Sequence, residues 1–145
     1  MPSIFCWMEV WCRIRDLLIA LVLICTSVTD IKRREVPVIY QALLLVLIPF
    51  GFHIENLWGA LMAAPFFVAA IATDKIGGGD WKLIALLGVL LGMHRAFAAV
   101  VMGCIIFIIS SLVTEKTRGR GGMLFPFVPS LTAGYMVMLI LEVVV

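Results

Sequence analysis

The sequence has few polar residues for its length, because only 14% of its 145 residues are charged while 63% are apolar. An ordinary globular domain is about 45–50% apolar, so this chain carries more apolar side chain than a water-soluble fold could bury. The four cysteines include no Cys-x-x-Cys pair, which removes the usual signature of a zinc site or a redox dithiol. There is no internal repeat and no low-complexity tract. The composition indicates an integral membrane protein.

Six apolar segments follow one another along the chain, separated by short loops. A spanning helix needs about 20 residues, so six of them would leave no room for a soluble domain. We therefore expect an all-α fold, a polytopic membrane helix bundle with about six transmembrane helices in a single domain over residues 1–145. The first of these helices is expected to be retained rather than cleaved as a signal. The expected segments are about 10–29, 36–52, 57–73, 80–93, 95–114 and 123–144.

The basic residues divide unequally between the two sides of such a bundle. Eight of the eleven fall in the alternate loops 30–36, 73–82 and 114–122. The positive-inside rule places these loops in the cytoplasm and both termini outside, an N-out/C-out topology. The eight are Lys32, Arg33, Arg34, Lys75, Lys82, Lys116, Arg118 and Arg120, and the other three are Arg13, Arg15 and Arg95.

Two aspartates stand at the ends of apolar segments on this cytoplasmic side. Asp30 ends the first segment and Asp80 begins the fourth. A charge near the hydrocarbon region costs roughly 2.5–3.5 kcal/mol on insertion scales, so two acids at one depth suggest a pair that performs chemistry. His53 and His94 fall on the opposite side, which argues against a nucleophilic Ser–His or Cys–His arrangement built with these aspartates.

A glycine run, Gly77, Gly78 and Gly79, comes directly before Asp80. Glycine has no side chain and accepts unusual backbone angles, so an extended peptide could lie against this run beside the acid. The alternative is a flexible loop that ends in a helix-capping aspartate. The motif alone leaves both interpretations open.

A basic cluster, Lys32, Arg33 and Arg34, follows Asp30, and Pro37 fits the first turn of the next helix. The cluster can serve as a plain topology anchor. Alternatively, one of these cations pairs with an aspartate or with lipid phosphates.

Taken together, the two segments resemble the type IV prepilin peptidase family, membrane aspartic proteases with a Gly-x-Gly-Asp motif. A later Pro-Phe-x-Pro-x-Leu-x-x-Gly stretch is also similar, so the resemblance covers about residues 17–138. One departure is Val38, where the family often has Asn. The matching residues are Asp30, Lys32, Arg33, Arg34, Val36 and Pro37, then Gly77, Gly79, Asp80, Lys82 and Leu83, and finally Pro126, Phe127, Pro129, Leu131 and Gly134.

The resemblance implies an aspartic endopeptidase of a prokaryotic cell membrane that needs no metal or cofactor. Its expected partners are prepilin- or pseudopilin-type substrate proteins of type IV pilus and protein secretion systems, together with membrane lipids, and no nucleic acid. Longer family members add a cytoplasmic region with paired Cys-x-x-Cys motifs, linked to methylation of the product. This chain shows neither that region nor a glycine-rich nucleotide loop, so the short, peptidase-only form is expected.

Helix ends suggest how two such acids would divide the work. A helix dipole disfavours negative charge at its C-terminus, where Asp30 lies, and favours it at its N-terminus, where Asp80 lies. This argument predicts that Asp80 is the base and that Asp30 holds the shared proton. Asp74 is expected to be a solvated loop charge, and the spacing of Asp16 and Arg13 suggests a local ion pair.

Two other classes of protein remain alternatives at this point. A small proton- or ion-conducting transporter also uses intramembrane acids, but it would need polar residues near mid-bilayer or broken helices in matching halves. A non-catalytic assembly partner of a secretion system would not need both aspartates. The particular substrate and the oligomeric state are left open.

Overall fold

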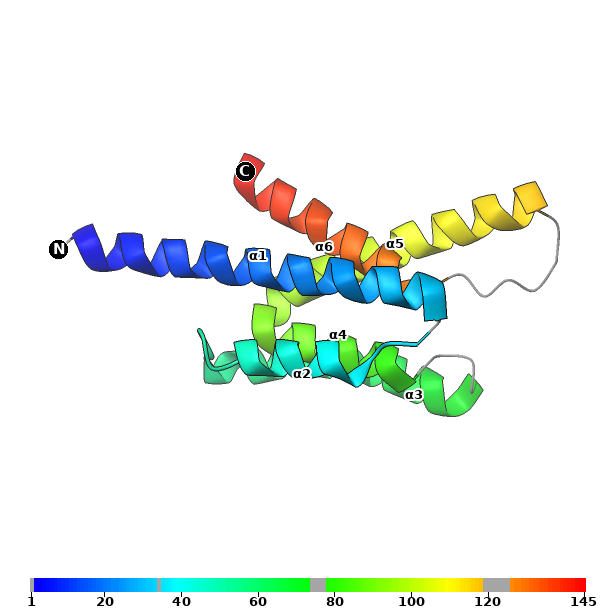
Figure 1. Ribbon diagram of the computed structural model, residues 1–145, viewed down its shortest axis with the longest axis horizontal. Helices are drawn as coiled ribbons and strands as arrows, with labels where there is room; N and C mark the ends of the chain where they lie inside the picture. Colours follow the sequence, from blue (N-terminus) through cyan, green and yellow to red (C-terminus); the bar gives the residue numbers. More distant parts are fainter. Residues whose placement is uncertain (1, 34, 74–77, 119–125) are drawn as a thin grey trace.

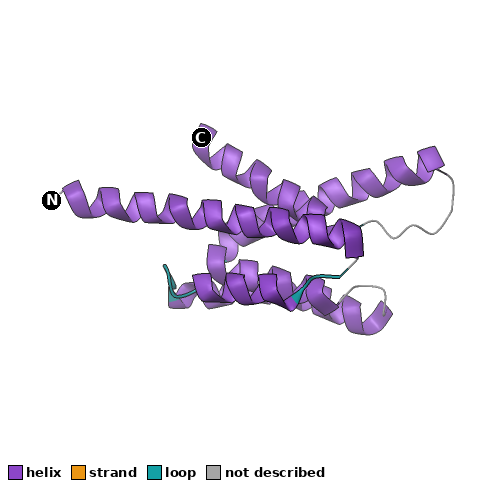
Figure 2. Ribbon diagram, viewed as in Figure 1, coloured by secondary structure: helices purple, strands orange, loops and turns teal. Residues whose placement is uncertain are grey.

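The computed structural model describes residues 2–33, 35–73, 78–118 and 126–145. Within these ranges, all of the regular secondary structure is helical, as Figure 2 shows. The chain is an all-α membrane bundle, which confirms the fold class expected from the sequence. Its elements are α1 Pro2–Arg33, α2 Val38–Leu47, the 3₁₀ helix η1 Ile54–Ala63, α3 Ala64–Thr73, α4 Gly78–Leu91, α5 Met93–Arg118 and α6 Phe127–Val144.

The helices form two layers (Figure 1). One layer contains α1, α5 and α6, and the other contains α2, η1, α3 and α4. Both chain termini lie at one end of the bundle, whereas the end of α1 and the start of α4 lie at the other. The layers meet where α1 packs on α2 and where α5 packs on α4 and η1. The bundle therefore brings Asp30 and Asp80 to the same end from different layers.

Glycine pairs allow helices to approach closely within each layer. A Cβ atom on Gly88 of α4 would collide with the backbone of Gly59 in η1, and one on Gly134 of α6 would collide with the backbone of Gly103 in α5. Small residues at such crossings let helix backbones pack tightly where lipid gives little hydrophobic driving force. These crossings set the spacing within each layer.

Three helical stretches of the described chain are long and apolar enough to cross a membrane, namely Ile54–Ala72, Met93–Thr117 and Phe127–Val144. The stretch that was expected at 57–73 begins as η1 and continues as α3. Pro65 has no N–H to donate to Leu61, and the Ala64 N–H bonds Leu61 in the tighter 3₁₀ pattern.

The remaining helices differ from an even six-span pattern. At 1.5 Å per residue, α2 is about 15 Å long and α4 about 21 Å, shorter than the hydrocarbon core of about 30 Å. In contrast, α1 has 32 residues and extends well before the expected start at residue 10. The count of about six transmembrane helices and the N-out/C-out orientation stay predictions.

Candidate active site

The two acid-bearing segments pack against each other. Asp30 lies in the last turn of α1 and Asp80 in the first turn of α4. Between them, a Cβ atom on Gly79 would lie 2.8 Å from Val36 Cβ, and Gln41 Nε2 donates a hydrogen bond to the Gly79 carbonyl oxygen at 3.4 Å. The loop that follows Asp30 is therefore seated on the residue that precedes Asp80.

Burial raises the pKa of both acids, which lie outside the three candidate spans. Burial and, as a smaller cause, the negative charge of Asp30 together raise the pKa of Asp80 to about 6. Burial also raises the pKa of Asp30, whose residue is only 6% exposed. Within the ranges described above, no Lys, Arg or His forms an ion pair with either acid. Two such carboxyl groups do not both ionise readily, so the arrangement favours one shared proton.

Asp30 is also held by a third helix. The backbone N–H of Val128, in the first turn of α6, donates to Asp30 Oδ2 at 3.3 Å. This hydrogen bond acts against burial and lowers the pKa of Asp30. The argument from helix ends considered only the C-terminus of α1 and missed the N-terminus of α6, which favours a negative charge.

Two residues of the glycine run belong to a helix, whereas one interpretation of the sequence was a flexible loop that ends in a capping aspartate. Gly78 and Gly79 are the first two residues of α4, so their backbone is helical. The space beside Gly79 is filled by Val36, whereas a Cβ on Gly78 would meet no atom within 4 Å. Gly78 thus leaves open space at the start of α4 while Gly79 serves packing. Gly77 lies outside the described residues.

The basic residues of the two motifs that the structure describes are exposed and form no ion pair with the acids. Lys32, Arg33 and Lys82 are exposed, and Lys82 Nζ lies 5.8 Å from the centre of the Trp81 ring. Pro37 takes the position just before the first turn of α2 rather than a place within it. Arg34 and Asp74 lie outside the described residues.

Polar side chains between α1 and α6 were not singled out from the sequence. Ser27 and Thr132 form a buried hydrogen bond of 2.6 Å between their hydroxyl oxygens. Thr132 also donates to the carbonyl oxygen of Val128 at 2.9 Å. The small polar residues Thr26, Ser27 and Thr29, which come just before Asp30 at the end of an apolar run, were the available signal. The partner of Ser27 could not be inferred without knowing that α6 lies beside α1.

A second group of charges lies at the other end of the same helices. Arg95 of α5 donates to Asp16 of α1 at 2.8 Å and to Glu142 of α6 at 2.6 Å. Tyr135 is fully buried, and its hydroxyl donates to the backbone carbonyl of Asp16 at 3.3 Å. The expected pairing of Asp16 with Arg13 is wrong, because the cation that reaches Asp16 most closely comes from α5.

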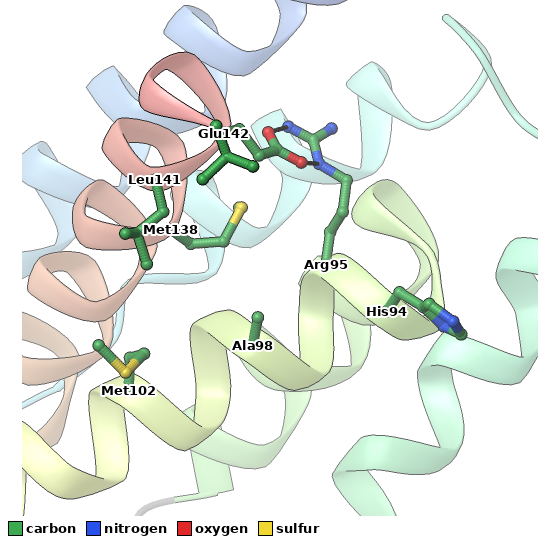
Figure 3. Close-up of a pocket in the computed structure, with 8 residues that line it drawn as sticks. His94, Arg95, Ala98, Met102, Met138, Leu141 and Glu142 are labelled. Atoms are coloured by element: carbon green, nitrogen blue, oxygen red, sulfur yellow. Dashed lines mark hydrogen bonds and ion pairs between the residues drawn. The ribbon is translucent and has the colours of Figure 1, made fainter.

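A pocket of about 470 Å³ lies beside this charged group, between α5 and α6 (Figure 3). Its walls are mainly apolar, and Arg95 and Glu142 bridge one side of it while His94 lies at its edge. Glu142 is 14 residues along α6 from Val128, or about 21 Å at helical rise. The pocket is therefore distant from Asp30. Within the described ranges, no three His, Cys, Asp or Glu side chains gather closely enough to hold a metal ion.

Comparison with known families agrees with this geometry. The type IV leader peptidase family matches residues 17–113, about two thirds of the chain, and the match includes both Asp30 and Asp80. It ends within α5, so α6 lies outside it. The comparisons with curated proteins and with solved structures gave no match. Because the family description spans most of the chain, the protein belongs to the type IV leader peptidase family.

Proposed function

We propose that the protein is an aspartic endopeptidase that removes the N-terminal leader of prepilin- or pseudopilin-type proteins. The observation that carries the proposal is the meeting of the two aspartates. Asp80 senses the charge of Asp30, and the segments around them are in contact through Val36 and Gly79. Two interacting acids that form no ion pair with a cation of the described residues are suited to sharing a proton and activating water.

In the proposed mechanism, the ionised acid accepts a proton from a water molecule as that water attacks the scissile carbonyl carbon. The protonated acid donates its proton to the carbonyl oxygen, which gives a tetrahedral intermediate. The acid that took the water's proton then protonates the leaving amine as the C–N bond breaks, while the other acid takes back a proton from a hydroxyl of the intermediate, which leaves a carboxylic acid and restores the starting pair. Asp30 and Asp80 supply every proton transfer, and no covalent intermediate forms.

The proposed substrate brings a short basic leader followed by an apolar helix in the bilayer. Its cleavage site would then lie at the membrane surface, at the depth of helix ends such as those that carry Asp30 and Asp80. We place this surface in the cytoplasm from the positive-inside rule. The open space beside Gly78 at the start of α4 offers room for the substrate backbone next to Asp80.

The test is co-expression with leader-bearing prepilins, with leader removal followed by gel shift. We expect the wild type to cleave at least one of these substrates and Asp30→Asn and Asp80→Asn to leave it uncleaved at equal protein levels. Asp74→Asn is the matched control and should retain appreciable cleavage. An inactive Asp74→Asn together with an active Asp80→Asn would mean that the pair is wrong. Proton flux into liposomes without peptide cleavage would favour the transporter instead.

A further inference from the structure

The carboxylate of Asp30 caps a helix to which it does not belong. Helix α6 begins after Pro126, and no side chain near that end of the helix caps it. The first N–H groups of a helix have no partner within it. Here the carboxylate of Asp30, 98 residues away in the sequence, accepts one of them from Val128 at 3.3 Å. Both residues are buried, with Val128 fully inaccessible and Asp30 6% exposed.

The register between α1 and α6 is fixed one turn away from this contact. Ser27 precedes Asp30 by three residues and therefore lies on the same face of α1. Its hydroxyl is bonded to that of Thr132, which in turn donates to the Val128 carbonyl. Thr132 also contacts the Leu23 carbonyl oxygen at 3.3 Å. Buried hydroxyl bonds thus hold the Val128 peptide opposite Asp30.

We propose that the first turn of α6 is a positioning element that keeps Asp30 ionised, so that Asp30 is the base of the pair and Asp80 carries the proton. The role of Asp30 as a base rests on the proposed function, whereas the hydrogen bond from Val128 to Asp30 is independent of it. This assignment of base and acid reverses the one drawn from the sequence. A carboxylate that accepts a backbone N–H at a helix N-terminus is stabilised in its charged form, whereas no hydrogen bond to the Asp80 carboxyl is found in the described chain.

Few other titratable groups face Asp30 from the neighbouring helices. Asp80 faces it from α4, and the first turn of α6 contributes no ionisable side chain. From α2, the Tyr40 hydroxyl oxygen is 3.4 Å from that of Thr29, the residue beside Asp30. Among the residues that follow Asp30 directly in the sequence, Lys32, Arg33 and Glu35 are exposed. Among the described residues, burial raises the pKa of both acids, and the N–H of Val128 is the contact that acts on Asp30 alone.

The decisive experiment removes that N–H and follows the titration of Asp30. In an Asp80→Asn background, infrared difference spectra against the Asp30→Asn/Asp80→Asn protein isolate the carboxyl band of Asp30. We expect Val128→Pro, which lacks the donor, to raise the pKa of Asp30 by about one unit. Val128→Ala keeps the N–H while shortening the side chain, so it should leave that pKa unchanged. Exchange of the amide at position 128 for an ester is a second way to remove the donor if the proline variant does not fold.

Equal shifts in Val128→Pro and Val128→Ala, or no shift in either donor-free variant, would overturn the inference. A second readout uses the otherwise wild-type enzyme, where the acidic limb of the pH profile of kcat/KM reports ionisation of the base. Val128→Pro should move that limb upward, and movement of the alkaline limb alone would make Asp80 the base. Failure of the proposed function is distinguishable, because it would appear as cleavage by Asp30→Asn or Asp80→Asn and would leave the infrared titration unaffected.

Discussion

The two ends of the bundle differ in whether their carboxylates are paired with a cation. At the end that holds both chain termini, Asp16 and Glu142 are bridged by Arg95, which ties three helices together. At the other end, Asp30 and Asp80 face each other across two layers, and no cation of the described chain pairs with them. Compensated charges stabilise a bundle, whereas uncompensated acids raise each other's pKa at a cost in stability. This difference supports the proposal that the second pair is the one that performs chemistry.

Removal of a carboxyl group should strongly lower cleavage at the end that holds Asp30 and Asp80 and have little effect on cleavage at the end that holds Asp16. This is the largest effect that we expect. With purified enzyme and a leader-bearing substrate, we expect Asp30→Asn and Asp80→Asn to lower kcat/KM by at least about 1000-fold, because each removes a proton-transfer group. Asp16→Asn should stay within about threefold of the wild type when compared at equal folded protein. A comparable loss of kcat/KM in all three variants would erase the distinction between the ends.

Removal of the bridging cation should have its largest effect on stability. Arg95→Met leaves Glu142 without its partner and Asp16 with only the longer contact to Arg15 at 3.6 Å. We expect a loss of roughly 1–3 kcal/mol in the free energy of unfolding, between the values for exposed and buried pairs. The intermediate figure reflects side chains that are 25%, 13% and 44% exposed at Arg95, Asp16 and Glu142. Thermal unfolding in detergent measures the loss.

A double-mutant cycle checks that the loss belongs to the ion pair. Asp16→Asn should recover part of the stability that Arg95→Met removes, since it takes away a largely buried charge that has lost its closest cation. Simple additivity of the two substitutions would mean that Arg95 stabilises the bundle by packing alone.

The acid pair should make stability fall as pH rises. Because the pKa of Asp80 is raised from 3.8 to about 6 in the folded protein, the folded state binds more protons than the unfolded state between these values. Stability is therefore highest near pH 4 and is lost as pH rises through about 6. Asp80→Asn should remove this loss, so the variant should unfold at a higher temperature than the wild type at pH 7 and at a similar temperature near pH 4. A variant less stable at pH 7 would contradict the expectation.

The smallest expected effects are those of alanine substitutions at Gly78 and Gly79, the two glycines just before Asp80, which should differ from each other. A Cβ on Gly79 would press on Val36, whereas one on Gly78 meets open space. We expect Gly79→Ala to lower both stability and cleavage by displacing the loop after Asp30. Gly78→Ala should keep or raise stability by up to about 1 kcal/mol, since alanine favours the helix. A selective rise in KM for Gly78→Ala would indicate that the substrate uses this space.

The sequence was sufficient for the fold class, and it predicted that Asp30 and Asp80 would lie at the same end of the bundle, where the structure has them. Strong apolar composition and charges at the ends of apolar runs express constraints that the bilayer imposes directly. Helix α4 begins two residues before the predicted start at residue 80, because Gly78 and Gly79 join the helix rather than precede it. The 3₁₀ character of η1 was not foreseen. It depends on tertiary contact with Gly88 and on Pro65, and no sequence period signals it.

Contacts between distant helices could not be predicted from one sequence. Arg95 was counted as an outer-side cation, but its pairing with Asp16 requires that α5 lie beside α1. Likewise, the donor to Asp30 is a backbone N–H, which every non-proline residue carries and which no residue type can signal. The assignment of Asp80 as the base therefore included the helix that carries Asp30 and omitted the helix that faces it, and which acid is the base stays a prediction.

The most direct test of the account is the influence of one acid on the other. The carboxyl titration of Asp80, isolated by infrared difference against Asp80→Asn, should be measured in the wild type and in Asp30→Asn. The account predicts that loss of Asp30 lowers the pKa of Asp80 from its value of about 6. An unchanged titration would mean that the two carboxyl groups do not sense each other, and it would contradict the claim that they act as a pair.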